Sequence, residues 1–151
     1  MRIFAFFFVF FLMTTTGFAF LGHNDSAKVE LLAQVEHQGS MVKLTVIGRT
    51  QPGFHVYSVK PQGEFGPKPT RLIIDQPQLK TMGPIEESKP MLMVDQAIGE
   101  SLLVHQGEFW VAQTFAPTQG KRFIQGYLFY QLCDNLICLT PVKQPFEARL
   151  P

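Results

Sequence analysis

Short apolar stretches alternate with polar turn segments along most of the chain, and valine, isoleucine and aromatic residues are frequent in these stretches. Residues 29–35 and 41–47 predict a first β-hairpin around a polar connection at residues 37–40. The candidates for its inward-facing side chains are Leu32, Val35, Val42, Leu44 and Val46. Further along, the same kind of pattern predicts strands at residues 54–59, 70–74, 91–94, 101–105, 108–115, 123–133 and 142–150.

Proline and glycine mark the connections between these strands. Residues 51–53 (Gln-Pro-Gly) predict a tight turn, and residues 60–69 hold three prolines and two glycines, which predict a loop. Loops are also expected on either side of Met82, because Pro77, Pro84 and Pro90 interrupt that region. No stretch keeps a helical period over three turns, and short strands at intervals of about 8–12 residues are typical of an antiparallel β-sandwich. We therefore predict an all-β protein.

The first 19 residues have the composition of a secretory signal peptide. Arg2 precedes an apolar run at residues 3–13, and Gly17 and Ala19 stand at the positions that the signal peptidase reads. The run is shorter than the roughly 20 residues that a membrane-spanning helix needs. An uncleaved anchor is the alternative, whereas the lack of a cysteine after the run argues against a lipoprotein. We predict a signal peptide at residues 1–19, one exported domain at residues 20–151 and no stable membrane insertion after cleavage.

Charge is balanced in the exported part. The chain has 13 basic and 12 acidic residues, and removal of Arg2 with the signal peptide makes the two numbers equal. No basic patch or run of charge is present, which argues against nucleic acid or an anionic membrane surface as a partner. The remaining length of about 130 residues suffices for one domain with its own core. Such a domain does not need a disulfide to fold.

Both cysteines of the chain, Cys133 and Cys138, lie at the end of an aromatic, strand-like segment. Asp134 and Asn135 between them are a turn pair, because short polar side chains bond their own backbone. We expect two antiparallel strands whose facing ends carry the thiols, at a separation that a disulfide can bridge. Tyr130, just before the pair, is expected in the core or beside the strand, with the alternative that its ring covers the sulfurs.

Three interpretations of the cysteine pair are open. As a structural disulfide it closes a ring of only six residues, which stabilises a fold by about 2 kcal/mol in the chain-entropy model. As a redox-active dithiol it cycles between thiol and disulfide. As a soft-metal site it binds copper(I) or zinc, but a closed zinc site needs four ligands. We predict no metal and no other cofactor, because no ligand spacing or haem-attachment motif involves the histidines, which are His23, His37, His55 and His105.

The neighbouring sequence does not activate either thiol. Thiolates are favoured beside cations, metals and helix N-termini, whereas Asp134 is acidic and the nearest cation in the sequence is Lys143. We therefore expect reaction to depend on a docked partner that brings its own sulfur and its own charges. The motifs of serine hydrolases, phosphate-binding loops and zinc proteases are absent from the sequence.

The region around the cysteines resembles a known family. It is similar to the end of the N-terminal periplasmic domain of the DsbD thiol:disulfide interchange proteins, also called the disulfide bond corrector domain. The similar segments are residues 126–133, the short turn, residues 138–141 and residues 146–150. That family often has a tyrosine-glutamine pair before the first cysteine and a proline, here Pro141, soon after the second. Residues 52–57 resemble its glycine-aromatic-x-x-tyrosine strand, which ends here at Tyr57, and residues 68–72 also fit.

The resemblance implies an immunoglobulin-like antiparallel β-sandwich whose cysteine pair relays electrons. In this family the domain takes electrons from a membrane thiol reductase through its thioredoxin-like domain. It passes them to thioredoxin-like periplasmic proteins, among them disulfide isomerases and cytochrome c maturation proteins. By this resemblance Cys138 forms the mixed disulfide, Cys133 resolves it, and Tyr57 lies near the site.

A cap loop over the sulfurs is expected, by the same resemblance, at residues 95–99, with Asp95, Ala97 and Ile98 as its site residues. The family usually has an aromatic residue in this loop, so Ala97 and Ile98 depart from the pattern. Multidomain members continue into a membrane domain and a thioredoxin domain, whereas this sequence ends at Pro151, so we expect that it either obtains electrons from a separate protein or does something other than relay them. Two other hypotheses stand beside exchange. One is a non-enzymatic binding or assembly module with a structural disulfide, and the other is a periplasmic copper carrier.

Overall fold

The structure is a computed structural model that describes residues 29–60, 66–96, 99–116 and 120–150. Within these ranges the secondary structure consists of strands and turns, and no helix there is long and apolar enough to cross a membrane. The predicted signal peptide lies outside the described residues. The strands are β1 (Glu30–Gln38), β2 (Met41–Arg49), β3 (His55–Tyr57), β4 (Arg71–Ile74), β5 (Thr81–Glu87), β6 (Met91–Asp95), β7 (Glu100–Gln106), β8 (Glu108–Phe115), β9 (Phe123–Tyr130), β10 (Leu132–Cys133) and β11 (Val142–Arg149).

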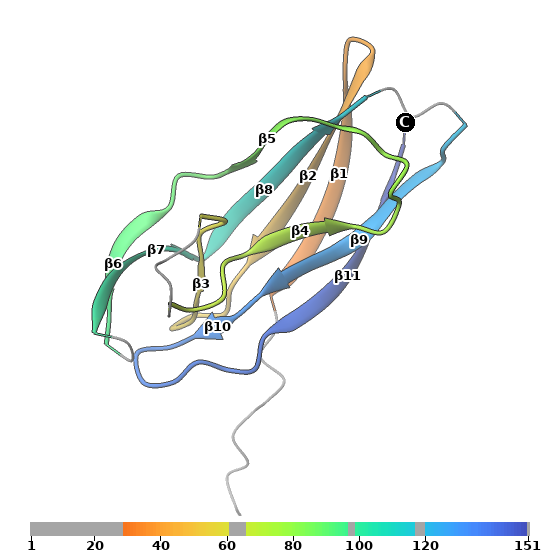
Figure 1. Ribbon diagram of the computed structural model, residues 1–151. Coiled ribbons are helices and arrows are strands. Elements are labelled where there is room, and N and C mark those ends of the chain that lie inside the picture. The colour runs from red at the N-terminus through yellow and green to blue at the C-terminus, as the bar shows by residue number, and fades with distance from the viewer. Residues whose placement is uncertain (1–28, 61–65, 97–98, 117–119, 151) are drawn as a thin grey trace, which may run out of the picture.

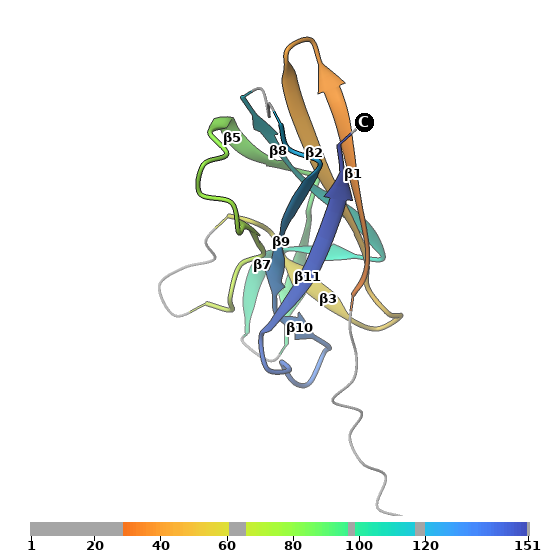
Figure 2. The same ribbon diagram turned by 90° about the vertical axis from the view of Figure 1, so that its right-hand side faces the viewer.

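The strands form three antiparallel sheets (Figure 1). The first has the order β1-β2-β8-β5 and the second the order β11-β9-β4, and together these two sheets supply most of the main cluster of buried side chains. Strands β1 and β11 lie side by side where the two sheets meet (Figure 2). The third sheet, β10-β3-β7-β6, lies at one end of the molecule. The prediction of an immunoglobulin-like antiparallel β-sandwich is confirmed.

Period-two alternation along the strands fills the core. On β2 the side chains of Val42, Leu44 and Val46 are buried, whereas the residues between them face the other side of the sheet. Val56 of β3 and Leu132 of β10 belong to the same core, so one face of the third sheet is anchored on the sandwich. The opposite face of β3 and β10 therefore carries the alternate residues, which include the first cysteine.

One inward-facing prediction on β1 is wrong. Leu32 is 55% exposed, whereas Leu31, Ala33 and Val35 are half-buried and pack against the core. Leu32 and Val35 are three positions apart, and side chains at an odd spacing point to opposite faces of a strand. The register pairs Leu32 with Ile47 and Val35 with Leu44, so only Val35 lies across from a buried core residue.

The region around Met82 was predicted as loop, but it forms the edge strand β5. Its pairing with β8 shifts register between Met82 and Glu86, and Gly83 has a positive φ of 78° within this irregularity. Pro84 lies in the same interval. An edge strand with a bulge tolerates proline because the missing N–H is not required there for pairing, so the proline signal did not exclude a strand.

Candidate functional site

The two cysteines form a disulfide across a short hairpin at the end of the third sheet. Cys133 ends β10 and faces Cys138 in an isolated antiparallel bridge, with a Cα–Cα distance of 4.0 Å. The side chain of Asp134 builds the turn, since its Oδ1 accepts the N–H groups of Leu136 and Ile137, each at 2.8 Å. Its N–H donates to the carbonyl of Ile137 at 3.0 Å. The predicted hairpin and turn are therefore present.

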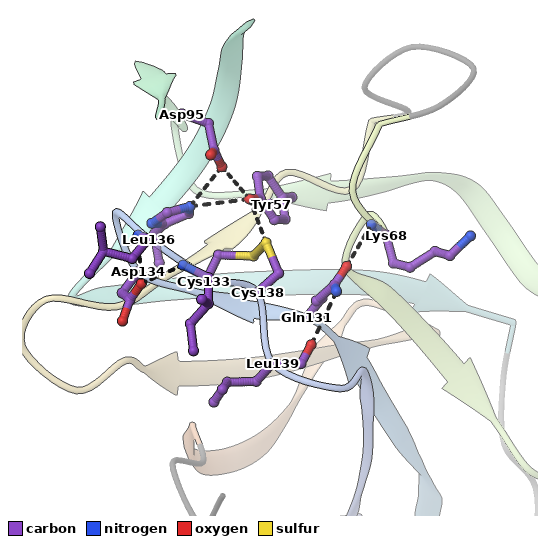
Figure 3. Close-up of a disulfide and its surroundings, with 11 residues drawn as sticks. Tyr57, Lys68, Asp95, Gln131, Cys133, Asp134, Leu136, Cys138 and Leu139 are labelled. Atoms are coloured by element: carbon purple, nitrogen blue, oxygen red, sulfur yellow. Dashed lines mark hydrogen bonds and ion pairs between the residues drawn. A yellow bond between two sulfur atoms is a disulfide. The ribbon is translucent and has the colours of Figure 1, made fainter. Parts of the chain in front are cut away.

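Gln131 makes hydrogen bonds that stabilise the start of this hairpin (Figure 3). Its Nε2 donates to the carbonyl of Leu139 at 3.1 Å, and its Oε1 accepts the N–H of Lys68 at 3.1 Å. One side chain thus joins the two arms of the hairpin to the segment that precedes β4. This contact gives a structural reason for the glutamine two residues before the first cysteine.

The two cysteines differ in access to solvent. Cys133 is completely buried, with Tyr57, Leu102 and Val104 in its cluster, whereas Cys138 is half-buried. The residues immediately before Cys138 are exposed, Leu136 at 81% and Ile137 at 38%. A molecule that approaches the disulfide from outside therefore meets Cys138 and an apolar rim, which we define as Leu136 and Ile137.

A buried polar cluster lies beside the disulfide (Figure 3). The Tyr57 hydroxyl donates a short hydrogen bond to Asp95 Oδ2 and lies 3.6 Å from Cys138 Sγ. His55 Nε2 lies 3.3 Å from both the Tyr57 hydroxyl and Asp95 Oδ2. All three residues are at most 2% exposed. We call them the His55–Tyr57–Asp95 cluster.

Strand pairing explains how residues from three segments meet here. His55 and Tyr57 alternate with Val56 on β3, so both face away from the main core. His55 pairs with Cys133 of β10 on one side and with Gln106 of β7 on the other. Asp95 arrives from the far edge of the same sheet, as the last residue of β6.

Burial and the carboxylate set the charges of the cluster. Burial raises the pKa of Tyr57 well above its ordinary value of 10.0, and the hydrogen bond and charge of Asp95 raise it further, so the hydroxyl stays protonated. Burial lowers the pKa of His55 from its ordinary 6.5, although the hydrogen bond and charge of Asp95 and the charge of Asp134 act in the opposite direction. The His55 imidazole is therefore neutral near neutral pH in the oxidised protein.

The other residues predicted from sequence have different places. Tyr130 lies in the main core, where its hydroxyl accepts the N–H of Val29 at 3.1 Å and donates to Gln144 Oε1 at 2.5 Å. Pro141 is half-buried just before β11. Ala97 and Ile98 lie outside the described residues. No group of three potential metal-binding side chains was found within the described ranges.

His55 is the member of the site that sequence reasoning missed. The sequence predicts ordinary polar or half-buried positions for the histidines and allows that one of them approaches the thiols in the fold, but nothing local to His55 indicates that it is the one. The signal available was its position two residues before Tyr57, which puts both side chains on one face if the segment is a strand. The pairing of β3 with β10 then supplies the contact.

These features define an immunoglobulin-like domain with a disulfide whose second cysteine is half-buried, beside the buried His55–Tyr57–Asp95 cluster. The chain belongs to the family of N-terminal domains of the thiol:disulfide interchange protein DsbD, whose model matches residues 24–149. Family and disulfide together are consistent with thiol-disulfide exchange in general. No match was found among curated proteins.

Solved structures with the same fold include two bacterial domains. The N-terminal domain of DsbD from Neisseria meningitidis, in its reduced form, is 22% identical with a TM-score of 0.55, and the match covers 86% of this chain and 90% of that chain. The N-terminal periplasmic domain of ScsB from Proteus mirabilis is 19% identical with a TM-score of 0.54. That match covers 86% of this chain but 48% of the other, so this chain spans about half its length.

Proposed function

We propose that this protein is an exported thiol:disulfide exchange domain in which Cys138 forms a mixed disulfide with a protein partner and Cys133 resolves it. The observation that carries this proposal is the unequal access of the two cysteines, with Cys133 completely buried and Cys138 half-buried behind an exposed turn. Such an arrangement exposes one sulfur to a partner and shelters the other, as the exchange reaction requires. Membership of the DsbD N-terminal family supports the same chemistry.

The exchange proceeds through two substitutions at sulfur. A partner thiolate attacks Cys138 Sγ, a bond forms between the two, and the Cys133–Cys138 bond breaks with its electron pair left on Cys133. A second thiolate of the partner then attacks the partner's first sulfur and releases Cys138 as a thiolate. The partner leaves as a disulfide, and the two thiolates of this domain take up two protons. The reverse sequence passes the two electrons to another disulfide.

The partners that fit this chemistry are thioredoxin-like periplasmic proteins, with a membrane thiol reductase as the source of electrons. Docking on the apolar rim brings a partner's sulfur to Cys138, because Leu136 and Ile137 directly precede it and are exposed. Asp134 and Asp95 place negative charge near the pair, and negative charge disfavours a thiolate. The thiols of the reduced domain therefore react slowly with small-molecule oxidants until a partner has docked.

Export is part of the proposal. Residues 1–19 act as the signal peptide and residues 20–151 form the exchange domain in the periplasm, where disulfides persist. Expression of the full sequence in a bacterium followed by mass spectrometry of the periplasmic protein tests this. A mature chain that begins near Phe20 is expected, and recovery of the uncleaved chain in the membrane fraction contradicts it.

Trapping experiments test the assigned roles of the cysteines. A Cys133→Ser variant is mixed with a thioredoxin that lacks its own resolving cysteine and carries thionitrobenzoate in a disulfide on its remaining cysteine. The Cys138 thiolate displaces thionitrobenzoate, and the mixed disulfide between the two proteins is followed on non-reducing gels and located by mass spectrometry. We expect accumulation through Cys138, and at least tenfold less with Cys138→Ser, because Cys133 is buried. Equal trapping by both variants contradicts the roles. A reduction potential below about −300 mV, as in inert structural disulfides, contradicts the exchange function itself.

A further inference from the structure

His55 is a group beside the disulfide that can change its charge. It is the direct cross-strand partner of Cys133 on β10, and cross-strand partners point to the same face of a sheet. On its other side, a continuous series of polar contacts leads from His55 Nε2 through the Tyr57 hydroxyl, at 3.3 Å, to Cys138 Sγ, at a further 3.6 Å. His55 is thus a cross-strand neighbour of Cys133, and its imidazole is linked to Cys138 through the Tyr57 hydroxyl.

The charged groups that face His55 are acidic. Asp95 approaches from β6 with Oδ2 at 3.3 Å, and Asp134 acts on the imidazole from the cysteine turn. Tyr57 on its own strand is a hydrogen-bonding phenol, and the neighbouring position on β7 is the uncharged Gln106. With a neutral imidazole, a thiolate that forms at the disulfide therefore lies near the negative charges of Asp95 and Asp134. With an imidazolium, one negative charge is cancelled.

We propose that His55 couples the exchange reaction to a proton, because exchange is faster when His55 is imidazolium as the Cys133–Cys138 bond breaks. The step balances in charge. A partner thiolate is consumed, a proton from solvent binds the imidazole, the bond between the partner sulfur and Cys138 forms, and the electron pair of the broken bond remains on Cys133. This inference rests on the proposed function and adds to it a residue that positions charge.

The environment of His55 supports this role. Burial lowers its pKa, while the hydrogen bond and charge of Asp95 and the charge of Asp134 oppose that effect. The imidazole is therefore mostly neutral in the oxidised protein near neutral pH, but the acids around it favour protonation. The thiolate on Cys133 adds another negative charge, which shifts the imidazole further toward its charged form. His55 acts through the field and hydrogen bonds of the cluster.

The test is the pH profile of disulfide reduction by glutathione. Rates are measured from pH 5 to 8 for the full domain and are divided by the concentration of glutathione thiolate at each pH. We expect the wild-type rate constant to rise about tenfold on acidification, the equivalent of one pKa unit. In His55→Gln, which keeps a side-chain donor for Asp95 but does not titrate, the profile is flat. The matched control His37→Gln, at an exposed position on β1, keeps the wild-type profile.

A second measurement uses only the wild-type protein. The pKa of the His55 ring in the oxidised domain, from the chemical shifts of its ring protons, must agree with the midpoint of the rate profile. Disagreement by more than about half a unit, or the same slope in His55→Gln as in wild type, overturns the inference while exchange remains. Loss of reaction at Cys138 in every variant, wild type included, instead overturns the proposed function.

Discussion

Replacing Tyr57 with phenylalanine tests the buried cluster with a minimal change of shape. The substitution removes one oxygen atom and keeps a ring that is completely buried. The hydrogen bond that Tyr57 donates to Asp95 is lost, and so is the contact of its hydroxyl with Cys138 Sγ. Asp95, which is 1% exposed, keeps His55 among its partners.

The expected cost follows from the charge of the acceptor. A hydrogen bond to a charged group contributes about 1.5–3 kcal/mol, and a buried carboxylate that loses a donor also keeps its desolvation penalty. We therefore expect the free energy of unfolding of the oxidised domain to fall by about 2 kcal/mol, which is roughly thirtyfold in the folding equilibrium. Urea titration followed by the fluorescence of Trp110 measures this change, with the m value unchanged.

Tyr127→Phe is the matched control, because Tyr127 is half-buried on β9 and lies outside the cluster. Its free energy of unfolding should change by less than about 0.5 kcal/mol, as for most substitutions away from buried networks. If Tyr57→Phe costs no more than this control, the hydroxyl does not stabilise the Asp95 carboxylate. The electrostatic description of the cluster would then be wrong.

Two further predictions concern the apolar rim and a carboxylate at the end of β5. Leu136→Ser should slow exchange with a thioredoxin about tenfold, the effect of losing one buried leucine contact, and leave the rate with glutathione within twofold. Leu92→Ser, at a position 69% exposed on β6, should change neither rate, and equal losses with both reductants would contradict docking on the rim. Glu87 is half-buried, with a side chain that is 8% exposed, and it contacts Ser58 and His105 at 2.6 and 2.9 Å. Burial alone would raise its pKa, but the hydrogen bonds from Ser58, His105 and the backbone outweigh burial and hold the pKa below 4.5. Because the pKa of Glu87 is depressed in the folded state, its carboxylate stabilises the fold above pH 4.5. This contribution is lost as the pH falls through the folded-state pKa. Unfolding free energy should therefore drop more steeply below pH 4.5 in wild type than in Glu87→Gln, and parallel curves would refute this.

Local sequence pattern was sufficient for the class of fold and for part of the site. Residues 108–115 were predicted as a strand with the bounds that β8 has, because a continuous apolar run at residues 109–112 with aromatic and β-branched side chains follows Gly107. Residues 51–54 form the predicted turn, with Phe54 N–H bonded to the Gln51 carbonyl at 3.1 Å and Gly53 at a φ of 85°. The cysteine turn followed from Asp134 in the same way, since its contacts are with residues two and three positions away.

What the sequence could not supply is information about register between distant strands. β5 was missed because a proline near a bulge at a sheet edge has the same local signature as a proline in a loop. His55 was missed because its contact with Cys133 depends on the pairing of β3 with β10. Its contact with Asp95 depends on β7 lying between β3 and β6. Neither of these strand arrangements can be recognised from a periodic pattern in the sequence.

The site separates three properties that a single reactive cysteine would combine. By our proposal the direction of attack follows from burial, because Cys133 is buried with Tyr57, Leu102 and Val104 while Cys138 is half-buried after the turn. Discrimination between proteins and small thiols belongs, by our proposal, to the apolar rim, whose side chains are exposed. The response to pH belongs to His55. Substitutions in the rim should therefore change partner preference without moving the pH profile, and His55→Gln should flatten the profile for every thiol alike.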